Sequence, residues 1–164
     1  MDSPGVSTFC TSFETNVKIP VVWEKPAAMV DVQSSEWGFF LQEWLPKMRA
    51  AQYVALIGDM GSGKTTFTRE VVAALGGDVA QVSSPTFSLT HRYDTPQGRV
   101  HHWDLYRMPD TPQDHAQLFL DLEASSGLVL IEWADRFADV VDYAGMALRF
   151  YFIDLAVRRV YVYF

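Results

Sequence analysis

The sequence predicts a three-layer α/β domain with a mixed, mostly parallel sheet and a C-terminal antiparallel hairpin. Three observations support this fold class. Short apolar runs alternate with segments of helical periodicity, as in strands joined by helices. Residues 53–57 are apolar throughout, as parallel strands buried on both faces are. Residues 147–153 and 158–164 are rich in Phe, Tyr and Val around Asp154, which indicates a hairpin.

The first predicted helix follows Ser34 and Ser35, either of which can cap it, with Glu36 in its first turn. We expect Pro46 to end or kink this helix early. Its apolar stripe favours core packing over a partner surface and contains Trp37, Phe40, Leu41, Trp44, Leu45 and Met48. A second helix is expected over residues 64–75, ending at Gly76-Gly77. Strand-like stretches lie near residues 87–93, 99–103 and 128–131.

Length and composition limit the possible functions. The 164 residues fit one domain, which we place at residues 26–164 after a peripheral or mobile N-terminal arm at residues 1–25. The net charge of −7 argues against direct binding to DNA or tRNA. Cys10 is the single cysteine, and no signal peptide or membrane-spanning run is evident, so we expect a cytoplasmic protein.

A phosphate-binding loop is the most specific motif. Gly58-Asp59-Met60-Gly61-Ser62-Gly63-Lys64-Thr65 matches G-x-x-x-x-G-K-[ST] between the predicted strand and helix. The glycines let backbone N–H groups surround a phosphate, and the helix N-terminus favours the negative charge. Lys64 can reach the β- and γ-phosphates, and the Thr65 hydroxyl can ligate Mg²⁺. The motif predicts ATP or GTP binding; the alternative is a glycine-rich turn that opens a helix.

Hydrolysis also needs a carboxylate that anchors the metal ion. Asp104 and Glu132 each end a predicted strand, and carboxylates at the ends of neighbouring parallel strands converge near the phosphates. Each could instead be a surface acid. The Ser83–Phe87 loop could approach the γ-phosphate, although Ser-Pro-Thr is also common in turns. The four histidines lack metal-ligand spacing, so we do not expect catalytic zinc.

Four segments together resemble the TsaE family, the bacterial P-loop ATPases formerly called YjeE. They follow in order over about residues 54–136: Gly58–Thr66, Ser84-Pro85-Thr86-Phe87, His102-Trp103-Asp104-Leu105-Tyr106-Arg107 and Ile131-Glu132-Trp133. The resemblance implies a P-loop NTPase fold with ATP and Mg²⁺ as cofactors. It implies an accessory role in tRNA N6-threonylcarbamoyladenosine (t6A37) modification. There, ATP hydrolysis would reset the TsaB–TsaD protein complex, with tRNA involved only indirectly.

The resemblance also implies residue roles. Lys64 and Thr65 take the phosphate and metal roles, and Asp104 and Glu132 bind the metal or position water. Thr86 lies in a switch-like loop, which makes it a further catalytic candidate. Trp133 lies beside the nucleotide or the partner. The remaining nucleotide contacts come from the loop itself: Asp59, Met60, Gly61, Ser62, Gly63 and Thr66.

Two departures from the family pattern affect the expected partner surface. The segment 108–126 lacks the usual Leu-Gly-rich helix pattern and is broken up by Pro109, Pro112 and Asp114. Ala134 stands where the family usually has proline, although Arg136 is in place. We therefore expect this region to differ from the family more than the ATP site does.

Two other function classes share a P-loop. A small-molecule or nucleoside kinase usually has a lid with several arginines, and no arginine-rich stretch lies between Asp104 and Glu132. A non-hydrolytic binding module would use the nucleotide only to order a docking surface. The sequence favours an ATPase with weak basal activity that is raised by its partner.

Overall fold

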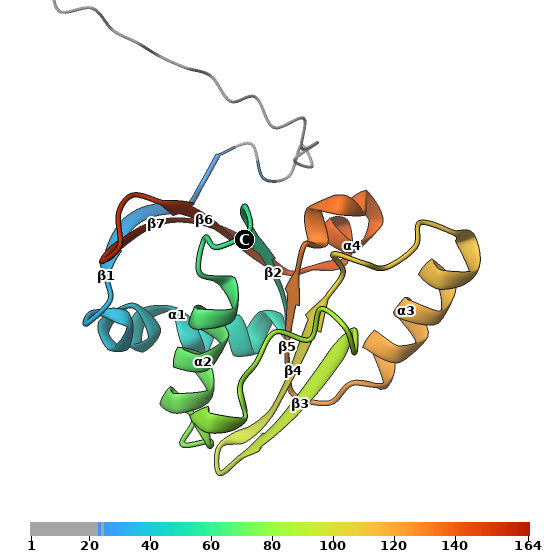
Figure 1. The fold of residues 1–164 in the computed structure, drawn as a ribbon, viewed down its shortest axis with the longest axis horizontal. Coiled ribbons are helices and arrows are strands. Elements are labelled where there is room, and N and C mark those ends of the chain that lie inside the picture. The colour runs from blue at the N-terminus through green and yellow to red at the C-terminus, as the bar shows by residue number, and fades with distance from the viewer. Residues whose placement is uncertain (1–22, 24) are drawn as a thin grey trace, which may run out of the picture.

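Figure 1 shows the computed structural model of the protein, which describes residue 23 and residues 25–164. Two 3-10 turns, Val79–Gln81 and Ala134–Arg136, accompany the main elements. In chain order these are β1 (Ala28–Gln33), α1 (Trp37–Ala51), β2 (Tyr53–Ile57), α2 (Lys64–Ala74), β3 (Thr90–Thr95), β4 (Gly98–Asp104), α3 (Pro112–Ala124), β5 (Leu128–Glu132), α4 (Ala138–Tyr143), β6 (Met146–Phe152) and β7 (Val157–Tyr163). The predicted N-terminal arm lies outside the described residues, apart from Trp23 and Lys25.

The strands form one mixed sheet in the order β1-β7-β6-β2-β5-β4-β3. The central strands β6, β2, β5 and β4 run parallel to one another. The outer strands β1, β7 and β3 pair antiparallel. The mixed sheet and the terminal hairpin β6–β7 are therefore confirmed. Three of the six pairs of neighbouring strands are antiparallel, which is a larger share than a mostly parallel sheet implied.

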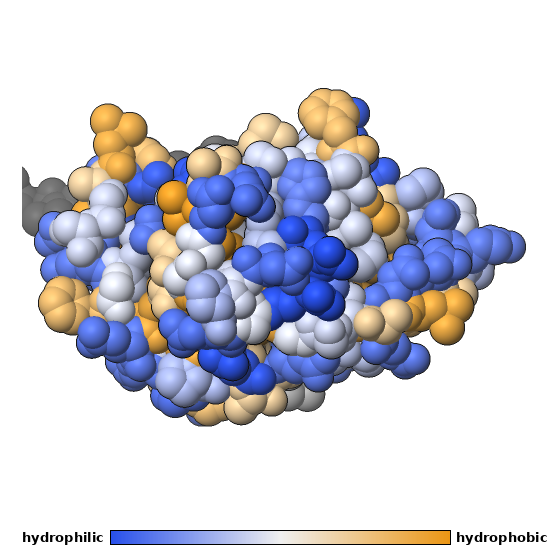
Figure 2. Space-filling model, turned by 90° about the horizontal axis from the view of Figure 1, so that it is seen from below, coloured by the Kyte–Doolittle hydropathy of each residue, from blue (hydrophilic) through white to orange (hydrophobic). Residues whose placement is uncertain are grey.

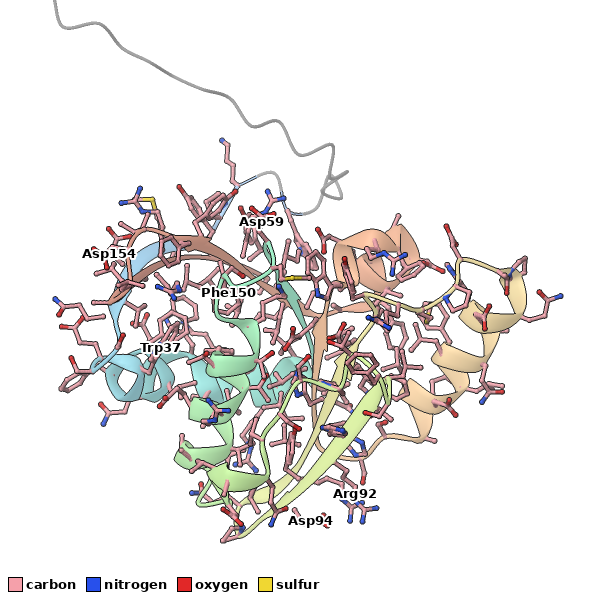
Figure 3. The ribbon with its side chains drawn as sticks, in the orientation of Figure 1. Trp37, Asp59, Arg92, Asp94, Phe150 and Asp154 are labelled. Carbon is pink, nitrogen blue, oxygen red and sulfur yellow. The ribbon has the colours of Figure 1, made fainter. Side chains whose placement is uncertain are left out.

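Helices cover both faces of the sheet, which gives the predicted three layers (Figure 1). Side chains of α1 and α2 form one buried apolar cluster with one sheet face, and those of α3 and α4 form a second cluster with the other. In the first cluster the Phe67 ring lies 5.4 Å from that of Trp37 and 5.3 Å from that of Phe150. Trp37 and Phe150 are labelled in Figure 3. This aromatic group holds α1 and α2 against the hairpin strand β6.

Helix α1 differs from its prediction at both ends. Glu36 is the N-cap residue and makes no side-chain cap, whereas the Ser34 hydroxyl donates to the carbonyl of Ala156. The helix continues through Pro46 to Ala51. Pro46 is exposed, so water can satisfy the carbonyl that its missing N–H leaves free. Core packing of the predicted apolar stripe therefore outweighs the loss of a helical hydrogen bond at Pro46. Five residues of the stripe are buried: Trp37, Phe40, Leu41, Trp44 and Met48.

The segment after residue 108 also contradicts the prediction, because it contains the helix α3. Pro112 occupies the first turn, where its missing N–H costs no hydrogen bond. The Thr111 hydroxyl accepts from the backbone N–H of Asp114 over 3.2 Å and caps the helix. Pro112 and Asp114 therefore start a helix that they were expected to break. Strand β1 and helix α4 were not predicted at all.

The elements that carry the phosphate-binding motif agree closely with the prediction. Strand β2 is parallel to both neighbours and almost fully buried. Helix α2 begins at Lys64 and ends before Gly76, whose positive φ of 79° closes the helix. The N–H of Gly77 donates to the carbonyl of Val72 over 2.9 Å, as in a Schellman motif. Strand β3 begins at Thr90, later than predicted, because residues 85–89 form a turn.

The motif residues and the β3–β4 turn lie at opposite ends of the sheet. In Figure 1, β2 leads up to the start of α2, whereas the β3–β4 turn lies at the bottom. Figure 2 views that lower end, and hydrophilic side chains cover most of its centre. Arg92 and Asp94, labelled in Figure 3, belong to it and lie 3.5 Å apart. The motif residues are at the other end, where the parallel strands finish.

Candidate functional site

The loop between β2 and α2 has the backbone shape that its glycines permit. Gly58, Gly61 and Gly63 have positive φ angles of 148°, 78° and 108°. A Cβ atom added to Gly58 would lie 2.6 Å from the carbonyl oxygen of Phe150. Residues other than glycine rarely adopt such angles, and a side chain at Gly58 would displace β6. The sequence therefore fixes a tight loop against β6, immediately before the N-terminus of α2.

Lys64 is folded back onto this loop. Its ammonium donates to the carbonyl oxygens of Gly58 and Asp59 over 2.7 and 3.0 Å, and its residue is only 4% exposed. The same nitrogen lies 4.2 Å from the ring centroid of Trp133, a cation–π distance. Burial lowers the pKa of Lys64, and nearby carboxylates, Glu132 foremost, oppose that change. A buried cation thus lies beside the glycines, where it could exchange its carbonyl partners for phosphate oxygens.

Glu132, at the end of β5, contacts side chains from both α2 and β4. The Thr65 hydroxyl, at the start of α2, donates to Glu132 Oε1 over 2.7 Å. The Nε2 atom of His102, on β4, lies 2.8 Å from the same oxygen. Glu132 and His102 are 3% and 0% exposed. The predicted carboxylate is therefore buried and aimed at the first turn of α2, and it is not a surface acid.

Asp104 holds the loop that carries Thr86. Its Oδ2 accepts from the hydroxyls of Thr86 and Ser84 over 2.5 and 3.0 Å, and its Oδ1 accepts from the N–H of Tyr106 over 2.9 Å. Asp104 also pairs with Glu132 in the register of β4 and β5. The two carboxylates therefore end adjacent parallel strands, as the sequence indicated.

The structure brings most of the predicted site residues together around one cavity. This cavity measures about 330 Å³ and is lined by Met60, Gly61, Gly63, Lys64, Thr65, Thr66, Ser84, Thr86, Asp104, Tyr106, Glu132, Trp133 and Arg158. A neighbouring cavity of about 560 Å³ shares Met60, Gly61 and Trp133 with it, and is also lined by Asp59 and Ser62. The predicted loop residues are therefore divided between two cavities that share part of the loop. Figure 3 labels Asp59 at this end of the molecule.

Several site residues were not predicted or had no assigned role. Arg158, from β7, donates to the carbonyl of Ser62 over 2.9 Å and adds a second cation to the smaller cavity, and no motif points to it. The Tyr106 ring packs 4.9 Å from that of Trp133. Asp135 lines the larger cavity; burial raises its pKa, and its Oδ1 has no hydrogen-bond partner in the described residues. Only Tyr106 lay within a motif identified in the sequence.

The oxygen donors of the smaller cavity suit a hard divalent cation. Thr65, Asp104 and Glu132 supply one hydroxyl and two carboxylates, which are the ligand types that Mg²⁺ prefers. Among residues 23 and 25–164, no group of three or more His, Cys, Asp or Glu side chains is placed to hold a metal ion by itself. Mg²⁺ usually takes its remaining ligands from substrate phosphates and water. The residues present therefore fit magnesium bound together with a phosphate.

The fold and this site define a P-loop-type α/β protein. The chain belongs to the TsaE family, because residues 33–159 match the family described as "Threonylcarbamoyl adenosine biosynthesis protein TsaE". The four segments on which the resemblance was based all fall within the matched range.

Relatives described as "tRNA threonylcarbamoyladenosine biosynthesis protein TsaE" agree with this assignment. The chain is 36% identical to the Rickettsia bellii protein over 96 residues, which are 58% of this chain and 66% of that protein. It is 33% identical to the Aquifex aeolicus protein over 109 residues, 65% and 77% of the two chains. It is 40% identical to the Bacillus subtilis protein over 82 residues, 49% of each. The match thus spans slightly less than two thirds of the Rickettsia protein and about half of the Bacillus protein.

A solved structure supports the fold. The crystal structure of YdiB from Bacillus subtilis superposes with a TM-score of 0.52 at 20% sequence identity, covering 83% of this chain and 86% of that one. At this identity the likeness concerns the fold alone. Separately, none of the helices in the described part of the chain has the length and apolar character needed to cross a bilayer.

Proposed function

We propose that this protein binds ATP with Mg²⁺ at the loop 58–65 and hydrolyses it. We further propose that it does so as an accessory protein of tRNA N6-threonylcarbamoyladenosine modification, acting on a TsaB–TsaD-type protein complex. Membership of the TsaE family supports the pathway. The chemistry of the cavity beside Lys64 supports the reaction.

Different residues of the cavity have different roles in the proposed reaction. Lys64 and the glycine-rich loop bind the phosphates, and the Trp133 ring lies 4.2 Å from the ammonium. Thr65, Glu132 and Asp104 would hold Mg²⁺, and the bound ion would neutralise charge on the triphosphate. Thr86 is anchored to Asp104 and can orient the attacking water toward the γ-phosphate. Catalysis of this kind relies on positioning and electrostatics.

One observation carries the proposal. The Thr65 hydroxyl points its proton at the buried carboxylate of Glu132 over 2.7 Å, beside the Lys64 ammonium. A hydroxyl that donates to a carboxylate keeps its oxygen lone pairs free for a cation, which is how P-loop enzymes hold magnesium. A glycine-rich turn with a solvated lysine would require neither the burial of Glu132 nor this contact.

The test has two parts. Calorimetry with ATP and Mg²⁺ measures binding, and absence of any heat of association would refute the proposal. Phosphate release is then followed with and without a purified TsaB–TsaD complex. We expect weak basal hydrolysis and a clear rise with the complex, because partners of P-loop enzymes often supply or order a missing group. Equal rates with and without the complex would contradict the proposed pathway role.

The same assay separates the two other function classes. Incubation with ATP and pools of nucleosides and small metabolites would reveal a phosphorylated acceptor if the protein were a kinase. Binding of ATP without phosphate release, alone or with the complex, would indicate a non-hydrolytic binding module. Only release of inorganic phosphate without an acceptor agrees with an ATPase.

A further inference from the structure

His102 is a buried histidine whose contacts are unusual for a residue that only fills the core. It is fully buried, and its Nε2 lies 2.8 Å from Glu132 Oε1. An ionised carboxylate only accepts hydrogen bonds, so the proton of this contact belongs to His102 Nε2. The other ring nitrogen, Nδ1, lies 3.4 Å from the hydroxyl of Tyr93. Both nitrogens therefore face polar groups, and one of those groups belongs to the phosphate site.

The strand register explains why His102 faces the site. His102 and Asp104 are two residues apart on β4, so their side chains project from the same face of the sheet. Asp104 pairs with Glu132 in the neighbouring strand β5, and paired residues share a face. This is the face that α2 covers, which brings Thr65 to the same carboxylate.

Two donors from different elements fix one oxygen of Glu132. Thr65 donates from α2 and His102 donates from β4, over 2.7 and 2.8 Å. When the lone pairs of the Thr65 oxygen bind a cation, the imidazole contact helps the Thr65 hydroxyl to hold the carboxylate in place. Without that contact, a buried glutamate loses a charge-assisted hydrogen bond and can rotate about its side-chain bonds.

The contact extends toward the loop that carries Thr86. Tyr93 is a buried residue, and its hydroxyl lies 3.2 Å from the carbonyl oxygen of Ser83 and 3.4 Å from His102 Nδ1. Ser83 directly precedes Ser84, whose hydroxyl donates a hydrogen bond to the carboxylate of Asp104. His102 therefore links Glu132 to the start of this loop through a single tyrosine.

We propose that His102 is a positioning residue that holds the Glu132 carboxylate toward Thr65 and the phosphate site. The proposal rests on the proposed ATPase function. His102 is not among the described residues that line the cavity, so it acts through Glu132. Its effect therefore falls on hydrolysis and on the contribution of Mg²⁺ to binding, with little effect on phosphate binding by the loop itself.

Three substitutions separate positioning from packing. His102→Gln places an amide N–H near the position of Nε2, so it retains the donor to Glu132. His102→Asn is one methylene shorter and places its amide near Nδ1, so it can reach Tyr93 but not Glu132. His102→Leu fills the space without any donor. The Gln and Asn variants are matched in chemistry and differ only in reach, so this pair decides the question even if the leucine variant does not fold.

The experiment compares ATP affinity by calorimetry with and without Mg²⁺, the rate of phosphate release and the thermal unfolding midpoint. We expect His102→Asn and His102→Leu to lose about 10–100-fold in hydrolysis rate, the range for residues that orient metal-associated carboxylates. Their ATP affinity without Mg²⁺ should stay within about 2-fold of wild type, whereas the gain in affinity on adding Mg²⁺ should shrink. His102→Gln should restore both the rate and the gain.

Two outcomes would overturn the proposal. Wild-type rates and an unchanged Mg²⁺ effect in a folded His102→Asn protein would show that the contact has no role in positioning. A folded His102→Gln protein as impaired as His102→Asn would assign the loss to something other than the donor. Failure of the proposed ATPase function is recognised separately, because the wild-type protein would then release no phosphate. In that case the proposed role of His102 would also be wrong.

Discussion

The hydroxyl of Thr65 donates to the carboxylate of Glu132 over 2.7 Å, joining two residues that are 67 positions apart in the sequence. This contact connects the first turn of α2 to the end of β5. It places a hydroxyl and a buried carboxylate beside Lys64, which lines the same cavity. The proposed chemistry depends on these groups being held together before any ligand arrives.

The first prediction concerns the charge of Glu132. Glu132→Gln keeps the size of the side chain and an oxygen that can accept from Thr65, but it removes the negative charge. ATP should bind with an affinity within a few-fold of wild type, because Lys64 and the loop are unchanged. Hydrolysis should fall by about 100-fold or more, in line with losses seen when an electrostatic group is removed from an active site. Glu132→Ala should behave similarly.

Calorimetry and phosphate release measure these two quantities on the same protein sample. Glu123→Gln provides a matched control, because Glu123 is an exposed glutamate in α3. That variant should bind and hydrolyse ATP like wild type. A Glu132→Gln protein with an unchanged rate would show that our assignment of Glu132 is wrong.

The second prediction concerns Lys64. Lys64→Ala removes the ammonium that contacts the loop carbonyls and faces Trp133. ATP affinity should fall by about 10-fold or more, equivalent to one charge-assisted hydrogen bond, and turnover should be abolished. Lys47→Ala is the control, because Lys47 also lies over a tryptophan ring, 3.9 Å from that of Trp44, but in α1. If both variants bind ATP equally well, Lys64 does not contact the phosphates.

The third prediction uses the loop that Asp104 anchors. Thr86→Ser retains a hydroxyl that can donate to Asp104, whereas Thr86→Val retains the shape and loses the donor. Hydrolysis should stay near the wild-type rate in the serine variant and fall by about 10–100-fold in the valine variant. Hydrogen exchange over residues 83–88 should be faster in the valine variant alone. Similar rates in the two variants would mean that the hydroxyl does not matter.

Sequence reasoning located the site where local pattern and strand order determine it. The loop glycines with Lys64 form a contiguous motif, so their shape follows from the sequence itself. Asp104 and Glu132 each end an apolar run, and parallel strands bring such ends together. The prediction of both carboxylates therefore required only that β4 and β5 be neighbours, as they are.

The residues that sequence reasoning missed depend on side-chain contacts between distant elements. His102 was part of a family motif and was considered as a metal ligand, but it received no role, because its contact with Glu132 follows from strand register. Arg158 reaches Ser62 from the last strand, 96 positions away, without any motif. Pro112 was interpreted as a breaker, although proline is favoured in the first turn of a helix. The roles of His102 and Arg158 were missed because their partners are distant in the sequence, whereas Pro112 was misinterpreted because its position in the helix was not considered.

The fourth prediction concerns the dependence of stability on pH. His115 lies between two carboxylates, 2.9 Å from Asp110 and 2.8 Å from Asp139, and joins α3 to α4. The hydrogen bond that His115 donates to Asp139 raises the pKa of His115 above its ordinary value of 6.5, and Asp110 adds to this effect. A raised pKa in the folded state stabilises the protein fully below pH 6.5. The stabilisation is lost as pH rises through the folded-state pKa.

His115→Gln should therefore lower the unfolding midpoint relative to wild type at pH 6, by an amount that corresponds to about 0.5–1 kcal/mol for partly exposed ion pairs. The difference should shrink as the pH rises from 6 through the folded-state pKa, because the imidazole of the wild-type protein then loses its charge. Thermal unfolding of both proteins across this range provides the measurement. A difference that stays constant with pH would show that His115 contributes through packing against Phe137 alone.

The fifth prediction tests the shape of the phosphate-binding loop without any ligand. Gly58→Ala puts a Cβ atom 2.6 Å from the carbonyl oxygen of Phe150, at a φ of 148°. Backbone strain alone costs about 1–3 kcal/mol, and the clash with β6 adds to it, so the unfolding midpoint should fall clearly. Gly38→Ala is the control, because Gly38 lies in α1 with open space around its Cβ position. That change should raise stability by about 0.5–1 kcal/mol through helix propensity. Chemical denaturation of the three proteins measures both effects, and a Gly58→Ala protein as stable as wild type would show that the loop is not packed against β6 in solution.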